Sequence, residues 1–292
     1  MAPLVSVVTI TYNHERYISN CIEGVLSQIT NFPIEFIIAE DCSTDRTRII
    51  CEDYARIHPE MIRLITSENN LGYNANELRA MKSARGKYIA YCEGDDFWTD
   101  CMKLQKQVDF LESHPMYSIC FHRCRHWDAD SGKYMEDACG NLFASGEEGV
   151  DVSIEMFFKK WITQPLSMVF RVDCFDMSLY KKYRYYRDMH QIYHLLIAGK
   201  GYLFAFDGGV RTIHIGGIAS KLNVAGQCRN GVAIARELYQ ANKDVYTKNY
   251  YTEMLQWYLY NIHELKGKRL YYSIELLFLT GNLKKFIHNL IR

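Results

Sequence analysis

Apolar runs and amphipathic segments alternate through the first 115 residues of the chain. Residues 5–12 form a nearly continuous β-branched run, which is typical of a strand buried on both faces. Similar runs predict strands over residues 34–39, 62–66 and 87–92, and the segments between and after them predict helices over 16–28, 44–58, 73–84 and 99–113. Such alternation predicts a mostly parallel, Rossmann-like α/β sheet with helices on both faces. Ligands bind these sheets at the carboxyl ends of the strands.

Beyond Pro115 the alternation weakens. Strands are expected over residues 117–127, 165–172, 202–206 and 210–215, and helices over 152–161 and 188–198. Gly86, after the helix at 73–84, is expected to provide a left-handed cap. From about Gly226 the chain is helical in pattern and rich in aromatic residues. We therefore expect an α/β domain over residues 1–222 and a C-terminal helical extension over 223–292.

The overall charge and the cysteines restrict the class of protein. The 292 residues include 34 basic and 34 acidic side chains, so a broad basic surface for nucleic acid is not expected. The N-terminus lacks the pattern of a signal peptide, and no apolar run reaches the roughly 18 residues that a membrane span needs. The ten cysteines contain no Cys-x-x-Cys pair, which indicates reduced, mostly buried thiols. We expect a cytoplasmic protein.

Two acidic clusters follow predicted strands. The first is Glu40-Asp41-Cys42-Ser43-Thr44-Asp45, and the second is Glu93-Gly94-Asp95-Asp96. Carboxylates at strand ends can bind a base or a ribose, and closely spaced ones can hold Mg²⁺ or Mn²⁺ together with a diphosphate. The alternative is that these residues only cap helices and form turns. Capping is favoured for Asp45, and a ligand site is favoured for the second cluster, because several uncompensated carboxylates would face one crevice.

Four motifs occur in order along the first half of the chain: VSVVTITYN at residues 5–13, EDCSTD at 40–45, NNLGYN at 69–74 and EGDDFW at 93–98. In order and spacing this set resembles the family 2 glycosyltransferases of GT-A-type fold, in the nucleotide-diphospho-sugar transferase superfamily. The resemblance covers about the first 110 residues, and further matches run to about Lys221. Glu40 and Cys42 stand where the family usually has aspartate and glycine, and Glu93 stands where aspartate is commoner.

The resemblance implies roles for individual residues of the first half. Thr11 and Asn13 would lie beside the nucleotide, and Asp41 would bond the base, usually uracil. Asp95 would contact the metal, Mn²⁺ or Mg²⁺. Glu93 would lie near the ribose or the metal, and Asp96 would support the turn.

The second half supplies candidates for the remaining chemistry. Inverting transfer needs a base that takes the proton of the acceptor hydroxyl while the nucleotide diphosphate leaves. Asp188 resembles the acidic residue of the acceptor site in the family and is our candidate base; the alternative role is a helix N-cap. Residues 211–217 resemble a late segment that closes over the diphosphate, so Arg211 could pair with a phosphate and His214 could bind the metal or a phosphate. A structural role for His214 is equally open.

Two other patterns would suit a zinc site. Cys120, His122, Cys124 and His126 alternate along a predicted strand, and His190 and His194 lie four residues apart on a predicted helix. Neither pattern has the tight spacing of a structural zinc site, so zinc is not expected.

The C-terminal tail, residues 265–292, contains six basic side chains and one acidic one, interleaved with apolar residues. A basic amphipathic helix can lie on an anionic membrane, where a lipid-linked acceptor would be found, and peripheral contact with the inner face of the cell membrane is one expectation. Ordinary helix packing, on the α/β domain or in an oligomer face, is the other expectation.

The leading functional hypothesis is an inverting, metal-dependent glycosyltransferase. It would move a sugar from a UDP-sugar to a glycan or lipid-linked acceptor in the biosynthesis of cell-surface polysaccharide. A sugar-nucleotide nucleotidyltransferase is an alternative, although it would normally have a Gly-rich loop where this chain has Thr11-Tyr12-Asn13-His14-Glu15. A non-catalytic nucleotide-sugar-binding protein is another, although it would not need both Asp95 and Asp188. The sequence does not specify the donor sugar or the linkage.

Overall fold

The computed structural model describes residues 2–135, 139, 142–160, 162–217, 223–261 and 268–282. The chain forms two compact units. The first comprises Met1–Tyr180 and Gln191–Ile213, and the second comprises Lys181–His190 and His214–Arg292. The expected domain boundary after residue 222 falls in a segment, 218–222, outside the described residues.

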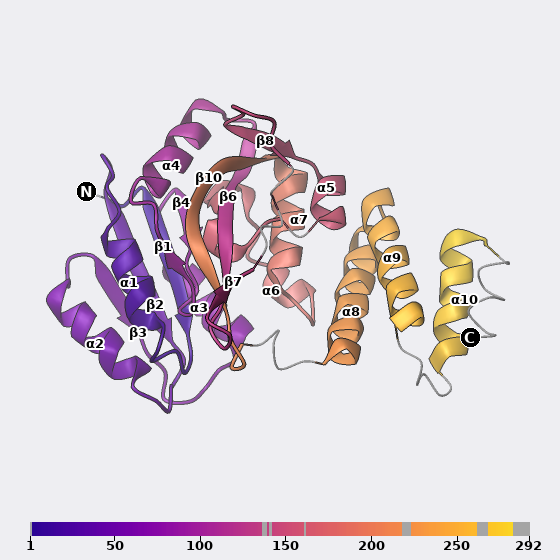
Figure 1. Cartoon of the computed structure of the whole chain (residues 1–292), viewed down its shortest axis with the longest axis horizontal. Coiled ribbons are helices and arrows are strands. Elements are labelled where there is room, and N and C mark those ends of the chain that lie inside the picture. Colours follow the sequence, from indigo (N-terminus) through magenta and orange to yellow (C-terminus); the bar gives the residue numbers. More distant parts are fainter. Residues whose placement is uncertain are drawn as a thin grey trace. The chain divides into compact units, whose positions relative to one another are not determined.

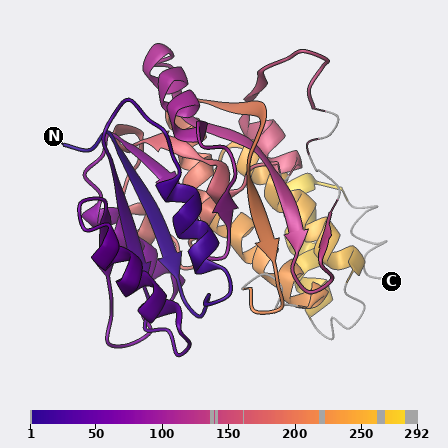
Figure 2. The ribbon, with the colours of Figure 1, turned by 60° about the vertical axis from the view of Figure 1, so that its left-hand side comes forward.

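A mixed sheet of ten strands forms the centre of the first unit (Figures 1 and 2). Four strands make its N-terminal half and are parallel, as the alternating pattern predicts; their order is β3-β2-β1-β4. They are β1 (Val5–Thr11), β2 (Ile34–Glu40), β3 (Ile62–Ile65) and β4 (Tyr88–Tyr91).

The other half of the sheet is largely antiparallel. Strand β9 (Val169–Arg171) joins β4 to β6 (Tyr117–Asp128), and β10 (Lys200–Ile213) runs parallel to β6. The short strands β5 (Phe97–Trp98) and β8 (Gly149–Val152) pair with β10, and β7 (Lys133–Tyr134) pairs with β6. The predicted α/β fold is thus confirmed, with antiparallel strands added in its second half.

Helices cover both faces of the parallel half. On one face α1 (Ile18–Leu26), α2 (Thr47–Ile57) and α4 (Lys103–Ser113) contribute apolar residues to the same core as β1 and β2. Helix α3 (Tyr73–Ser83) packs against the same two strands through other buried residues, including Ala80 and Met81. The unit is completed by α5 (Ile154–Lys159), the 3₁₀ turns η1 (Pro165–Ser167) and η2 (Val172–Cys174), the first half of α6 (Leu179–Lys182) and most of α7 (Asp188–Ala198).

Gly86 does not provide the expected left-handed cap. It is absent from the residues with positive φ, and α3 ends instead at Ala84 in an extended conformation. The glycine is needed for space: a Cβ atom at this position would lie 2.5 Å from the backbone nitrogen of Ser6. The expected cap was wrong because glycine is required here by close contact with β1, which lies some 80 residues earlier in the chain.

The region expected to form two strands, 202–206 and 210–215, forms the single strand β10. The register shifts around Asp207, so the strand continues through an irregularity rather than ending. Gly208 and Gly209 allow this close packing, since a Cβ at Gly208 would lie 2.7 Å from the ring of His122. The strand expected over 165–172 is shorter for a different reason: Pro165 begins the 3₁₀ turn η1, and only Val169–Arg171 pairs with the sheet.

The second unit contains the helical C-terminal part that the sequence predicts. Helices α8 (Val224–Asn242), α9 (Val245–Asn261) and α10 (Lys268–Thr280) pack on one another. Arg236 of α8 joins them through a 2.6 Å ion pair with Glu275 of α10 and a 2.7 Å hydrogen bond to the hydroxyl of Tyr251. Among the described helices, none is long and apolar enough to cross a membrane.

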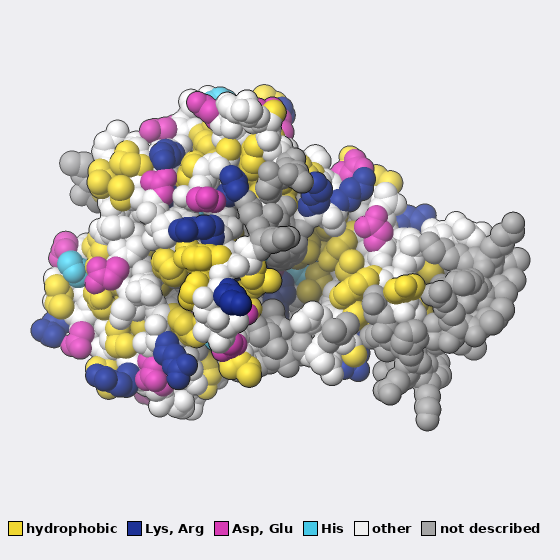
Figure 3. All heavy atoms as spheres, viewed as in Figure 1, with side chains coloured by type: hydrophobic (Ala, Val, Ile, Leu, Met, Phe, Trp, Pro, Cys, Tyr) yellow, Lys and Arg dark blue, Asp and Glu magenta, His cyan; other side chains and the backbone are white. Residues whose placement is uncertain are grey.

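Basic and acidic side chains are interspersed on the face shown in Figure 3. The cysteines agree with the sequence analysis. All ten cysteines are free thiols, and seven of them are buried.

Candidate functional site

The ends of three parallel strands bring the two acidic clusters together. Thr11, the last residue of β1, is paired in register with Glu40, the last residue of β2. The backbone N–H of Asp41 donates to the carbonyl of Thr11 (3.0 Å), and the N–H of Gly94 donates to the carbonyl of Ile10 (3.1 Å). Both clusters therefore lie beside the carboxyl end of β1, the position at which such sheets bind ligands.

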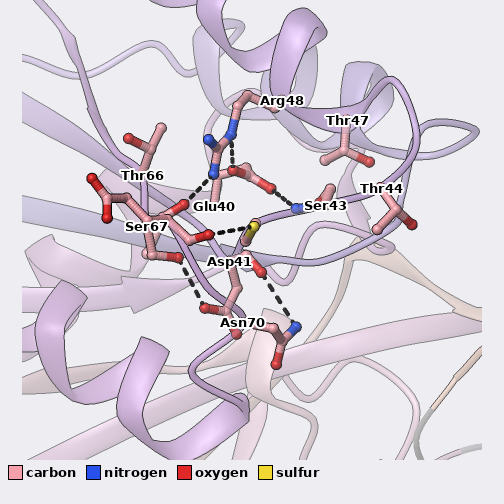
Figure 4. A network of polar contacts seen from close by, with 12 residues as sticks. Glu40, Asp41, Ser43, Thr44, Thr47, Arg48, Thr66, Ser67 and Asn70 are labelled. Carbon is pink, nitrogen blue, oxygen red and sulfur yellow. Dashed lines mark hydrogen bonds and ion pairs between the residues drawn. The ribbon is translucent and has the colours of Figure 1, made fainter.

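Asp41 holds the loop that follows β3. Its carboxylate is 2% exposed and accepts the backbone N–H groups of Leu71 and Gly72, each at 2.9 Å. The hydroxyl of Ser67 donates to the same group (3.3 Å), and the Asn70 side chain donates to the Asp41 carbonyl (Figure 4). An ionised carboxylate offers about four acceptor positions, so capacity remains on the oxygen that faces Gly72. The predicted bond from Asp41 to a base stays a prediction.

A buried ion pair supports this loop from the other side. Arg48 of α2 donates to the Glu40 carboxylate (2.6 Å) and to the carbonyl of Ser67 (2.6 Å), while the N–H of Ser43 donates to the other Glu40 oxygen (2.6 Å) (Figure 4). Glu40 is fully buried, and hydrogen bonding to it raises the pKa of Arg48. Sequence reasoning treated Glu40 only as a departure from the family pattern. The sequence feature that could have indicated this ion pair is a basic residue, Arg48, eight positions later on the next helix.

Cys42, where the family usually has glycine, adopts a backbone conformation that is easy for glycine. Its φ of 61° is in the left-handed region, which favours glycine, and its thiol lies 3.1 Å from the carbonyl oxygen of Glu68. The cysteine therefore has a backbone conformation that is strained for a residue with a side chain.

The loop after β1 is bonded to the start of α2. The side-chain oxygen of Asn13 accepts the N–H of Thr44 (2.8 Å), and the N–H of His14 donates to the hydroxyl of Thr47 (2.8 Å). Asp45 accepts both the N–H (2.9 Å) and the hydroxyl (2.6 Å) of Thr47 at the first residue of α2. Asp45 thus bonds the first turn of α2, as favoured, although the N-cap residue itself is Arg46. Asn13, whose φ is 58°, holds the loop together, and its contact with a nucleotide stays a prediction.

The turn after β4 packs directly on this loop. A Cβ at Gly94 would lie 2.6 Å from the Thr11 hydroxyl and 2.9 Å from Nδ1 of His14, so only glycine fits. Next to it, the carboxylate of Asp95 lies 3.9 Å from Nε2 of His14. Sequence reasoning did not single out His14. The sequence feature that could have indicated it is its position, three residues after the end of β1, which places it near the acidic turn.

Asp96 connects the turn to β10. It accepts the backbone N–H of Thr212 (2.8 Å) and is 3% exposed. Burial raises the pKa of its carboxyl well above the usual value, and the charges of Asp95 and Glu93 act in the same direction, while Arg211 opposes them. The charge of Arg211 thus acts on the acidic turn, although its predicted contact with a phosphate, like the nucleotide role of Glu93, stays a prediction.

A bound cation would offset the negative charges of the acidic turn. His14, Asp95 and His214, which directly follows β10, each offer one ligand atom, and the three atoms lie within 4.8 Å of one another. Two imidazoles and a carboxylate suit a divalent metal ion, so the residues present fit the predicted cofactor. Within the described parts of the chain, no other group of three potential ligands is this close. The patterns at residues 120–126 and at 190 and 194 thus form no such group. His122 is fully buried, and burial lowers its pKa well below the usual value.

Asp188 is the first residue of α7, and the helix begins and ends as predicted. Its carboxylate accepts the N–H of Met189 (2.9 Å), and together with burial its charge raises the pKa of Tyr250 on α9. These contacts lie within the second unit. They are compatible with a capping role and with a base, so the catalytic role stays a prediction.

Comparison with known proteins identifies the class. The fold of the first unit, with an acidic turn at the carboxyl ends of parallel strands, is that of the GT-A-type glycosyltransferases. The sequence model of glycosyl transferase family 2 matches residues 6–186, well over half of the chain. The chain belongs to glycosyl transferase family 2.

Relatives match the chain over part of their length. An uncharacterized protein of Mycobacterium tuberculosis is 40% identical over 166 residues, which are 57% of this chain and 46% of that protein. The putative teichuronic acid biosynthesis glycosyltransferase TuaG of Bacillus subtilis is 40% identical over 109 residues, 37% of this chain and 42% of TuaG. The chain thus spans less than half the length of these curated relatives.

Solved structures share the fold. Staphylococcus aureus TarS 1–349 in complex with UDP-GlcNAc aligns with a TM-score of 0.63 and 18% identity, covering 98% of this chain and 79% of TarS 1–349. The mannosyltransferase PcManGT of Pyrobaculum calidifontis, in complex with GDP-Man and Mn²⁺, aligns with a TM-score of 0.54 and 14% identity, covering all of this chain and 87% of PcManGT.

Proposed function

We propose that this protein transfers a sugar, with inversion, from a UDP-sugar to a glycan or lipid-linked acceptor in the biosynthesis of cell-surface polysaccharide. Membership of glycosyl transferase family 2 supports a transferase over the two alternative classes. The similarity to TuaG, named for teichuronic acid biosynthesis, supports a polysaccharide product, and the complex of TarS with UDP-GlcNAc supports a UDP-sugar donor.

The observation that carries this proposal is that the loops of Asp41 and Asp95 both lie beside the end of β1. One carboxylate lies in the loop network after β2, and the other lies in the turn after β4 beside His14. This arrangement separates a base-binding end from a diphosphate-binding end on the same edge of the sheet, as a nucleotide-diphospho-sugar requires.

The site residues would then have separate roles in binding the donor, binding the metal and activating the acceptor. Thr11, Asn13, Asp41, Glu93 and Arg211 would hold the nucleotide, and Asp95 and His214 would hold Mn²⁺ or Mg²⁺. The bound metal neutralises charge on the leaving diphosphate. Asp188 would accept the proton of the acceptor hydroxyl as that oxygen attacks the sugar from the face opposite the leaving group.

A donor screen tests the proposal. The purified chain is incubated with UDP- and GDP-sugars, Mn²⁺ and a panel of glycan acceptors, and nucleoside diphosphate release and the anomeric configuration of the product are measured. We expect release from a UDP-sugar, inversion, and loss of both in Asp95→Asn with an unchanged melting temperature. Full activity of Asp95→Asn would contradict the metal assignment.

The same samples distinguish the alternative classes. A nucleotidyltransferase would release pyrophosphate from a nucleoside triphosphate and a sugar phosphate. A binding protein would be stabilised by a nucleotide sugar without turning it over. Either result in place of nucleoside diphosphate release would overturn the proposal.

We also propose that the protein works at the cytoplasmic face of the membrane, through α10. Along this helix Leu276 is buried, while Tyr271, Ile274 and Phe278 lie on the exposed side, with Phe278 85% exposed. The spacing of these three residues places them on one helix face. The basic excess of the tail favours an anionic lipid surface as the partner of that face.

A further inference from the structure

The side chain of His14 is held in one orientation. Its Nδ1 lies 3.2 Å from the hydroxyl of Thr11, which is 2% exposed at the end of β1 and therefore fixed by the sheet. The backbone N–H of His14 is bonded to Thr47 on the opposite side of the loop. With Nδ1 bonded, the other ring nitrogen, Nε2, faces the carboxylate of Asp95.

The separation of His14 and Asp95 suits two ligands of one ion. Nε2 lies 3.9 Å from the nearer Asp95 oxygen, which is too long for a hydrogen bond. Two ligand atoms that each lie about 2.1 Å from the same metal ion are separated by about 3.0–4.2 Å, depending on the angle between them. The hydroxyl of Thr11 would then orient the imidazole, as outer hydrogen-bond partners commonly do for metal-binding histidines.

Gly94 allows the turn that carries Asp95 to lie close to His14. The turn that carries Asp95 can approach the imidazole only because residue 94 has no Cβ, which would lie 2.9 Å from Nδ1 of His14. Side-chain exposure is only 18% for His14 and 22% for Asp95, so both groups are largely withdrawn from solvent yet still reachable by an ion.

We propose that His14 is a direct ligand of the divalent cation and makes the site select Mn²⁺ or Co²⁺ over Mg²⁺. Imidazole nitrogen is a good ligand for transition metals, whereas Mg²⁺ prefers oxygen and gives up its water reluctantly. The ligand set therefore includes a residue of the β1 loop besides Asp95 and the family-implied His214. The inference rests on the proposed metal-dependent transfer, but metal binding tests it without any donor or acceptor.

The first experiment measures Mn²⁺ and Mg²⁺ affinity of the purified chain by calorimetry and Mn²⁺ electron paramagnetic resonance. We expect His14→Gln to lose on the order of tenfold or more in Mn²⁺ affinity, because even outer-shell partners of a ligand contribute about 10–100-fold. Mg²⁺ affinity should fall less. His14→Asp supplies an oxygen ligand and should shift the preference towards Mg²⁺. His58→Gln, a histidine at the end of α2, is the matched control and should bind both metals as the wild type does.

The second experiment detects bound nitrogen directly and does not depend on the folding of a His14 variant. Electron spin-echo modulation of the Mn²⁺-loaded His214→Gln variant should still show a ¹⁴N signal, because His14 remains. Absence of that signal, unchanged Mn²⁺ affinity in His14→Gln, or failure of the wild type to bind Mn²⁺ or Co²⁺ would each overturn the inference. Loss of transfer with every donor, while the metal results stand, would contradict only the proposed function.

Discussion

Lys103 is the first residue of α4, and its side chain is completely buried. Its ammonium lies 3.6 Å from the centre of the Trp98 ring, and among the described residues Nζ has no hydrogen-bond partner. Burial lowers the pKa of Lys103 to about 7 from the ordinary value of 10.5. The native state therefore disfavours the charged form, and we expect Lys103→Met to remove that cost.

The sign of the pH dependence follows from the two pKa values. Between about pH 7 and pH 10.5 the unfolded chain holds a proton on Lys103 that the native state has released, so the free energy of unfolding rises with pH. Each pH unit contributes about 1.4 kcal/mol, or on the order of 5 kcal/mol over the whole window. Below pH 7 both states are protonated and this contribution no longer changes.

Urea unfolding at pH 7.0 and pH 8.5, followed by tryptophan fluorescence, measures the effect. Over this range we expect the stability advantage of Lys103→Met over the wild type to shrink by about 2 kcal/mol, because only the wild type gains stability from deprotonation. Lys106→Met is the matched control, since Lys106 lies on the same helix and pairs with Asp100 at the surface (2.6 Å). A constant difference between Lys103→Met and wild type at both pH values would refute the reasoning.

Three further predictions concern acid stability, the division of roles in the site, and the membrane. Burial would raise the pKa of Glu35, but hydrogen bonds from groups that include Arg85 hold that pKa below its usual value. The contribution of Glu35 to the free energy of unfolding is therefore present above about pH 4.5 and lost as the pH falls. Glu35→Gln should cost about 1–3 kcal/mol at pH 7 and make stability less dependent on pH in acid, as urea unfolding at a series of pH values would show. Asp41→Ala should weaken nucleotide binding in calorimetry, whereas Asp188→Asn should keep it and lose about 10²–10⁴-fold in turnover; failure of Asp188→Asn to bind nucleotide would rule out the base role. The full chain should co-sediment with anionic vesicles at low salt, and less so for Phe278→Ser or at high salt; no binding at low salt excludes the membrane role.

Much of the site's location followed from local patterns. A β-branched run such as Val5–Thr11 indicates a buried strand wherever it occurs, and helix α7 was predicted with its bounds correct. Because parallel strands end at one edge, Asp41 and Asp95 could be placed together before their contacts were known. The capping role of Asp45 was also local, since its partner Thr47 lies two residues away, one position after the N-cap residue Arg46.

The sequence alone thus determined the order of the elements in the parallel half, the edge of the sheet that carries the site, and the family. Only the tertiary structure showed that His14 faces Asp95, that Arg48 neutralises Glu40, and that Gly86 serves packing rather than a cap. The physical reason is distance along the chain. Hydrophobic periodicity reports which face of an element is buried, but the partner of a side chain 80 residues away depends on how the completed strands and loops pack.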